Sequence, residues 1–250
     1  MLRSAHELLG YRIHATDGNL GKVHDFLLDD QSWAVRYIVV DTGFWMPNRQ
    51  VLISPVEAGQ PRWSQHVLPV TLTRQQVEDS PLIEAHLPVS RQHELRLVDY
   101  YGWPTYWGPT GPVMADVPVS TAEEPPAPQT SPDPHLRSMR ELRGYHLCAS
   151  DGQIGHVADF IVDTESWTVR YVIVDRRNWL PGKKVLLAAG WIENVDWANR
   201  LVHADLPREE ISNSPPFDPA APVNRAYEQR LYDYYGRPAY WQGKEEKQPV

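Results

Sequence analysis

An internal repeat constrains the fold of this chain more than any other feature of its sequence. A single offset of 134 positions places residues 4–107 over residues 138–241 without a gap, and 42 of the 104 aligned residues are identical. About 100 residues are enough for an independent hydrophobic core, so each copy is predicted to be one domain. We therefore predict domains at 1–107 and 138–241, and residues kept in both copies indicate what the shared fold requires.

Residues 108–137, which join the copies, are rich in proline and include Pro125-Pro126-Ala127-Pro128. A segment with so few large apolar side chains buries too little surface to offset the entropy of ordering, so it is predicted to be a linker. Residues 242–250, which carry two glutamates and two lysines, are predicted to be a short disordered tail. The cytoplasm is the expected location, because the chain shows neither the apolar core of a signal peptide nor an apolar run long enough to span a membrane.

Each copy has the pattern of a small antiparallel β-barrel. An Asp-Gly pair between apolar runs, at Asp17-Gly18 and Asp151-Gly152, is a strong hairpin signal because glycine adopts positive φ without steric cost. Runs of β-branched and aromatic residues then predict further strands, which in the first copy cover 20–29, 33–41, 50–53 and 66–72. Five or so short strands favour closure into a barrel, which removes exposed edges.

The end of each copy is predicted to be a helix of about ten residues, after a helical turn at 73–79 or 207–213. Ser90 and Asn224 suit its N-cap, and Gly102 and Gly236 lie where it should stop. The predicted fold is therefore mainly β, with two tandem small antiparallel barrels, each followed by a short C-terminal helix and an aromatic tail.

A charged pair recurs in the central hairpin of each copy. If the turns at 30–31 and 164–165 contain two residues, Asp25 lies opposite Arg36 and Asp159 lies opposite Arg170. One interpretation is a catalytic carboxylate tuned by arginine. We favour the other, a structural pair that fixes the strand register.

The comparison of the two copies removes most candidates for chemistry. None of the ten histidines is kept in both copies, which disfavours a histidine site in the ancestral domain. The one cysteine, Cys148, corresponds to His14. The shared aspartates and glutamates fall mainly at turns, strand ends and helix starts, where structural roles suffice. We therefore predict no catalytic, cofactor-binding or metal-binding residues and no enzymatic activity.

The most distinctive shared segment is Asp99–Trp107, repeated as Asp233–Trp241. Its aromatic residues are candidates for a protein interface, because large side chains with polar tips contribute contact area and hydrogen bonds. In the alternative, which we favour, the tail folds back and its rings close one end of the barrel. Tyr106 and Trp107 are the better interface candidates within this set: Tyr100, Tyr101, Tyr106, Trp107, Tyr234, Tyr235, Tyr240 and Trp241.

These residues also carry a family resemblance. The opening Leu-x-Gly-Tyr, the motif at Asp17–Phe26 and Asp151–Phe160, and the Trp-x-Val-Arg-Tyr strand resemble the PRC-barrel domain. That family is named after the cytoplasmic domain of the photosynthetic reaction-centre H subunit, and a related barrel forms the C-terminal domain of the ribosome maturation factor. The resemblance implies a non-enzymatic barrel that binds proteins, and it supplies no catalytic residues.

The expected function is a bacterial adaptor that binds protein partners, and two alternatives are open. One is an accessory or assembly protein for membrane-bound photosynthetic or electron-transfer complexes. The other is binding of a small molecule, anion or metal by one copy, through His14 or Cys148 or through the basic cluster Arg176, Arg177, Lys183 and Lys184. The net charge of -8 argues against nucleic acid as a partner. Two arrangements of the repeats are also open, a packed pseudo-dimer or two independent domains.

Overall fold

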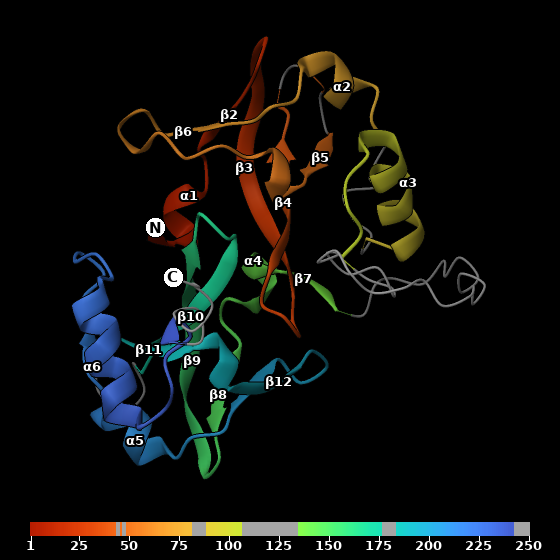
Figure 1. The fold of residues 1–250 in the computed structure, drawn as a ribbon. Coiled ribbons are helices and arrows are strands. Elements are labelled where there is room, and N and C mark those ends of the chain that lie inside the picture. Colours follow the sequence, from red (N-terminus) through yellow and green to blue (C-terminus); the bar gives the residue numbers. More distant parts are fainter. Residues whose placement is uncertain (44–45, 47–48, 82–88, 107–134, 177–183, 243–250) are drawn as a thin grey trace, which may run out of the picture. The chain divides into compact units, whose positions relative to one another are not determined.

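The computed structural model describes residues 1–43, 46, 49–81, 89–106, 135–176 and 184–242 (Figure 1). The chain divides into two compact units, each of which combines separate segments of the sequence. Unit 1 contains Met1–Leu9, Leu28–Val35 and Arg137–Val250, and unit 2 contains Gly10–Leu27 and Arg36–Leu136. Unit 1 thus includes two segments of the first repeat, whereas the predicted domain boundaries at 1–107 and 138–241 stay a prediction.

The larger sheet belongs to unit 1 and has the strand order β12-β13-β8-β9-β10-β11-β14, with β1 also paired to β9. β8 and β13 alternate buried and more exposed residues, whereas β10 and β11 are buried along most of their length. Phe160, Tyr171 and Leu186 are among the side chains that fill the core. The bounds are β1 (Leu2–Ser4), β8 (His146–Ala149), β9 (Gly152–Asp163), β10 (Thr168–Asp175), β11 (Lys184–Ala188), β12 (Ile192–Asp196), β13 (Leu201–Ala204) and β14 (Pro216–Phe217).

The second sheet has the order β5-β4-β3-β2-β6, and β7 also pairs with β3. Phe26, Ile38 and Leu68 are among its buried side chains, which lie at core positions of the amphipathic strands. The bounds are β2 (Arg12–Ala15), β3 (Gly18–Asp29), β4 (Val35–Asp41), β5 (Gln50–Ile53), β6 (Val67–Pro69) and β7 (Leu136–Ser138).

The predicted terminal helices are confirmed as α3 (Arg91–Tyr101) and α6 (Arg225–Tyr235). The Ser90 and Asn224 side chains accept hydrogen bonds from the third residue of each helix, and Gly102 and Gly236 end the helices with φ of 71° and 61°. The predicted helical turns are confirmed as well. The remaining helical elements are α1 (Ala5–Leu8), α2 (Arg74–Glu78), α4 (Met139–Leu142), α5 (Arg208–Asn213), η1 (Pro55–Glu57), η2 (Trp63–Gln65) and η3 (Ala189–Trp191).

The mainly β class is confirmed, but the expectation of wholly antiparallel sheets is wrong at one place in each sheet. β6 runs parallel to β2, and β13 runs parallel to β8. Neither parallel pair is joined by a direct turn, because β3, β4 and β5 lie between β2 and β6, and β9, β10, β11 and β12 lie between β8 and β13. The pairings of the described residues do not close either sheet on itself, so closure into tandem barrels stays a prediction.

The predicted two-residue turn between the central strands is also wrong. Asp163 pairs with Thr168, so the turn spans four residues, 164–167, and in the first repeat the Asp29 N–H donates to Ala34 O over 2.9 Å. The longer turn is stabilised because the Asp163 carboxylate accepts from the Glu165 N–H and from Ser166 Oγ, while Trp167 adopts a left-handed φ of 49°.

This turn shifts the register on which the charged pairs depended. Asp159 lies opposite Ile173, not Arg170, and the predicted register of Asp25 with Arg36 fails because 29 does not pair with 32.

Among the described residues, no helix has both the length and the apolar character needed to cross a membrane.

Candidate functional site

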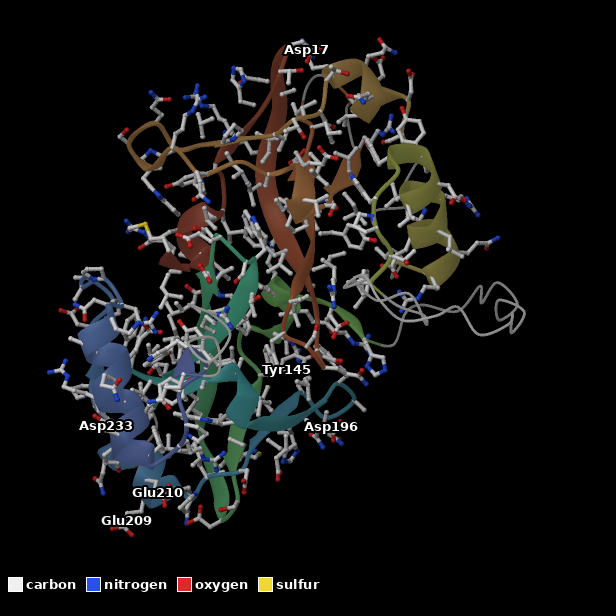
Figure 2. The ribbon with its side chains drawn as sticks, in the orientation of Figure 1. Asp17, Tyr145, Asp196, Glu209, Glu210 and Asp233 are labelled. Carbon is white, nitrogen blue, oxygen red and sulfur yellow. The ribbon has the colours of Figure 1, made fainter. Side chains whose placement is uncertain are left out.

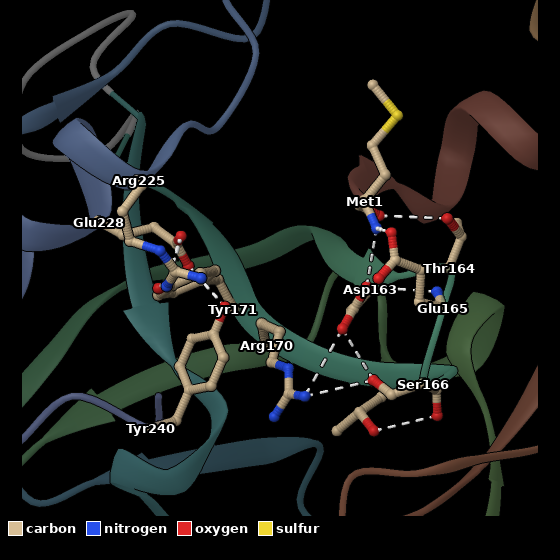
Figure 3. Close-up of polar contacts among 11 residues, drawn as sticks. Met1, Asp163, Thr164, Glu165, Ser166, Arg170, Tyr171, Arg225, Glu228 and Tyr240 are labelled. Atoms are coloured by element: carbon tan, nitrogen blue, oxygen red, sulfur yellow. Dashed lines mark hydrogen bonds and ion pairs between the residues drawn. The ribbon is translucent and has the colours of Figure 1, made fainter. Parts of the chain in front are cut away.

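The N-terminal strand of the first repeat is built into unit 1. β1 runs antiparallel along β9, with Leu2 opposite Asp163 and Ser4 opposite Ile161. The Met1 ammonium group donates to Asp163 Oδ1 at 2.9 Å and to Glu165 Oε1 at 3.1 Å (Figure 3). Main-chain pairing of this kind joins segments far apart in sequence without requiring a particular side chain. The first residues of the chain are therefore a strand of the sheet formed by the second repeat.

A second segment of the first repeat, the hairpin turn at 28–35, is also part of unit 1. The Val35 N–H donates to Trp167 O and the Val169 N–H donates to Trp33 O, each over 2.8 Å. The Trp197 indole N–H donates to Asp30 Oδ2 over 2.9 Å. Unit 1 thus holds two separate segments of the first repeat by hydrogen bonds to the second repeat.

A buried carboxylate anchors the C-terminal helix and tail in unit 1. Glu228 is 2% exposed, and its Oε1 accepts from the Tyr171 hydroxyl at 2.7 Å and the Tyr240 hydroxyl at 2.9 Å. Arg225 Nη1 lies 3.1 Å from Glu228 Oε2, and Figure 3 shows these side chains together. Glu228 therefore joins three elements of the unit: α6, β10 and the tail.

Both tyrosines of this network stay protonated donors at neutral pH. Burial, followed by the charge of neighbouring groups that include Glu228, raises the pKa of the Tyr171 hydroxyl. Burial, and then the hydrogen bond to Glu228, raises the pKa of Tyr240 to about 12. A hydroxyl that retains its proton can donate to the carboxylate, so the network is satisfied over the ordinary pH range.

Unit 2 contains the same network at the equivalent positions. The Tyr37 hydroxyl donates to Glu94 Oε2 over 3.0 Å, the Tyr106 hydroxyl donates to the same oxygen, and Arg91 Nη1 lies 3.2 Å from Glu94 Oε1. Glu94 and Glu228 lie in the first turn of α3 and α6, where the local sequence explains an acidic residue but does not indicate its burial. The signal that identifies them is the joint retention of the glutamate, both tyrosines and the arginine.

The ends of the aromatic tails pack against the domains. Arg36 lies 4.0 Å above the Tyr106 ring, and Arg170 lies 4.3 Å above the Tyr240 ring. Trp241 contacts Tyr232, with ring centroids 5.1 Å apart. This packing accords with the expected folding back of the tail, whereas closure of a barrel end by these rings stays a prediction. Trp107 lies outside the described residues.

The second tyrosine of each Tyr-Tyr pair packs against a tryptophan ring. Tyr101 stacks on Trp103 with ring centroids 4.2 Å apart, and Tyr235 lies 4.6 Å from Trp191. Burial raises the pKa of Tyr101 to about 12 and also raises that of Tyr235. These two residues therefore belong to the packed side of their helices.

The first tyrosine of each pair is exposed. Tyr100 and Tyr234 expose 41% and 40% of their surface, and their hydroxyls donate to Gln76 O and Glu210 O, each over 2.9 Å. Each ring also meets its neighbour edge-on, with centroid distances of 4.7 Å to Tyr101 and 4.9 Å to Tyr235. Both exposed rings are thus held by the same contacts in the two repeats.

Each exposed tyrosine has at least one acidic side chain near it. Burial and then the charges of Glu210 and Glu209 raise the pKa of Tyr234, and Figure 2 shows these glutamates on α5 and Asp233 on α6. Asp79 has the corresponding effect on the pKa of Tyr100, after burial. Glu209 and Glu210 correspond to Gln75 and Gln76, so the two repeats provide their negative charge largely from different positions. We name each exposed tyrosine with these acidic neighbours a tyrosine patch.

Three residues of the predicted charged pairs, Asp25, Asp159 and Arg170, make the following contacts. The buried Asp25 carboxylate accepts from the Phe26 N–H at 2.7 Å, and Asp159 accepts a hydrogen bond from Ser4 Oγ. Arg170 Nη2 lies 3.6 Å from Asp163, the aspartate of the turn. Asp159 therefore helps to hold β1, a role that no local pattern in the sequence indicated.

The basic cluster and Cys148 occur in the second repeat only. Arg176 of the basic cluster is buried and its Nη1 donates to Ser212 O over 2.5 Å, so this guanidinium is used inside the unit. Arg177 and Lys183 lie outside the described residues. Burial raises the pKa of the Cys148 thiol. Within the described residues, no group of three or more His, Cys, Asp or Glu side chains is placed to hold a metal ion.

Neither a family model nor a curated protein matches this sequence.

Proposed function

We propose that the chain is a non-enzymatic adaptor of the PRC-barrel type that uses its two tyrosine patches to bind protein partners. The observation that carries this proposal is the equal exposure of Tyr100 and Tyr234, which have the same backbone acceptor position and the same edge-on neighbour. Tyrosine is enriched at binding hot spots, and a ring already fixed in place loses little entropy on binding.

The chemistry of the patches favours a basic protein segment as the partner. The face of a tyrosine ring attracts arginine and lysine side chains, and the adjacent carboxylates add charge complementarity. Because negative charge is present at both patches although the residues differ, a preference for cationic partners is a property of both repeats.

We also propose that the repeats form an intramolecular pseudo-dimer rather than two independent domains. The supporting contacts lie inside unit 1, where β1 pairs with β9 and the 28–35 turn bonds to Trp167 and Val169. These contacts assign structural parts of the first repeat to the sheet of the second. The adaptor is preferred to a role in membrane-bound electron-transfer complexes, because the latter depends on resemblance alone.

Site-specific photo-cross-linking tests the adaptor function. A benzophenone amino acid placed at position 100 or 234, in cells that make the protein naturally, is expected to capture the same partner from both positions. The matched control is position 56, where Val56 is 61% exposed but has Gly190 as its counterpart in the second repeat. Glu209→Lys with Glu210→Lys should reduce capture at 234 several-fold and leave capture at 100 unchanged.

Two outcomes would contradict the proposal. Capture at 100 and 234 that does not exceed capture at 56 would show that the tyrosine patches bind no partner. Capture at 234 that is unaffected by the charge reversal would show that the partner is not selected by the acidic side chains.

A further inference from the structure

An open hollow of about 440 Å³ lies on the second-repeat part of unit 1. Three cationic side chains and one histidine line it, together with one carboxylate: Arg140, Arg143, Lys184, His156 and Asp175. With the histidine neutral, three positive charges and one negative charge leave a formal charge of +2. This local balance is opposite in sign to the net charge of -8 for the chain.

Arg143 is held in a defined position at this hollow. Its Nε donates to Ala158 O over 3.0 Å, and its Nη1 lies 3.1 Å from His6 Nδ1. Within the described residues these contacts leave the N–H groups of Nη2 without a protein acceptor. A guanidinium fixed on one side, with donors remaining on another, suits the recognition of a phosphate group because its planar fork is already oriented.

The equivalent positions of the first repeat lack this charge. Arg140, Arg143 and Lys184 correspond to His6, Leu9 and Gln50, whereas His156 corresponds to Lys22 and Asp175 to Asp41. One lysine and one aspartate give the first-repeat set a formal charge of zero. The backbone architecture is shared, so the cationic lining is a property acquired or kept by the second repeat alone.

We propose that this hollow is a binding site for a small organic anion that carries a phosphate group. The three cations supply charge-assisted hydrogen bonds to the phosphate, and the volume leaves room for the organic part of the molecule, since small-molecule sites span about 300–1,000 Å³. The site is separate from the tyrosine patches and does not depend on the adaptor function.

Calorimetric titration of the full chain in low-salt buffer tests this site with inorganic phosphate, phenyl phosphate and, for comparison, sodium chloride. Both phosphates are expected to give saturable binding, with phenyl phosphate the tighter ligand, and chloride is expected to give none. Replacing the three cations by their first-repeat counterparts, as Arg140→His, Arg143→Leu and Lys184→Gln, should weaken phosphate binding by about tenfold or more.

Single substitutions provide a matched comparison and a second variant if the triple variant does not fold. Lys184→Gln should weaken binding several-fold, whereas Arg230→Gln, which removes the same charge from the exposed face of α6, should leave it unchanged. Absence of saturable phosphate binding, equal losses in the two single variants, or no preference for phenyl phosphate over inorganic phosphate would each overturn the proposal.

Discussion

Replacement of Glu228 by alanine is expected to lower the free energy of unfolding by about 3 kcal/mol. The substitution removes the acceptor of both the Tyr171 and Tyr240 hydroxyls, and each donor that stays buried without a partner costs about 1–3 kcal/mol. The ion pair with Arg225 adds little to this loss, because the Arg225 side chain is 57% exposed and its charge is screened by solvent.

Urea denaturation followed by circular dichroism measures this effect. The slope of unfolding free energy against urea concentration must be the same in the variants for their midpoints to report stability alone. Glu228→Gln keeps an oxygen that accepts hydrogen bonds, so it should cost less than the alanine variant. Glu209→Ala is the matched control: it removes an exposed glutamate and should change stability by no more than about 0.5 kcal/mol. If Glu228→Ala is no less stable than Glu209→Ala, the buried network does not hold the helix and tail in place.

Gly155→Ala is expected to destabilise the protein by about 2–3 kcal/mol, although it adds a single methyl group. A Cβ atom at position 155 would lie 2.4 Å from Asp175 O, a backbone atom that cannot move without disturbing β10. Gly21, its counterpart, has the same close approach, with a Cβ position 2.1 Å from Asp41 O. The steric requirement explains why both repeats have glycine here.

Thermal unfolding with a matched alanine control separates this close approach from the general effect of replacing glycine. Beyond its neighbours in the chain, Gly190 has no heavy atom within 4 Å of its Cβ position, so Gly190→Ala should change stability by no more than about 0.5 kcal/mol. Equal melting temperatures for Gly155→Ala and Gly190→Ala would show that the strand and the Asp175 backbone are not packed as closely as described.

Much of the secondary structure could be predicted because its signals are local. The caps of α3 and α6 depend on residues within one turn of each helix end, and the Asp-Gly hairpins depend on neighbouring residues. The predicted length of the central turn is wrong because Trp167 adopts a left-handed backbone conformation, which is uncommon for a residue other than glycine. That single difference shifted the register and separated Asp159 from Arg170.

The pairing of β1 with β9 and the hydrogen bonds to buried Glu228 could not be predicted for a different reason. Both depend on contacts between segments far apart in the sequence. β1 contains only three residues, too few for a periodic pattern. Leu2-Arg3-Ser4 is nevertheless repeated as Leu136-Arg137-Ser138, which extends the internal repeat beyond the 104 positions that were aligned. Burial of Glu228 is equally invisible locally, since a glutamate near a helix start is ordinarily exposed.

Cleavage between the repeats tests most directly the central claim that unit 1 is built from both. A protease site inserted within residues 108–134 divides the chain into a first-repeat and a second-repeat fragment, and native mass spectrometry then measures their association. We expect a one-to-one complex, because β1 stays paired with β9 and the 28–35 turn stays bonded to Trp167 and Val169. Arg3→Pro, which removes an N–H from the middle of β1, should increase dissociation. Two fragments that separate completely without this substitution would contradict the claim.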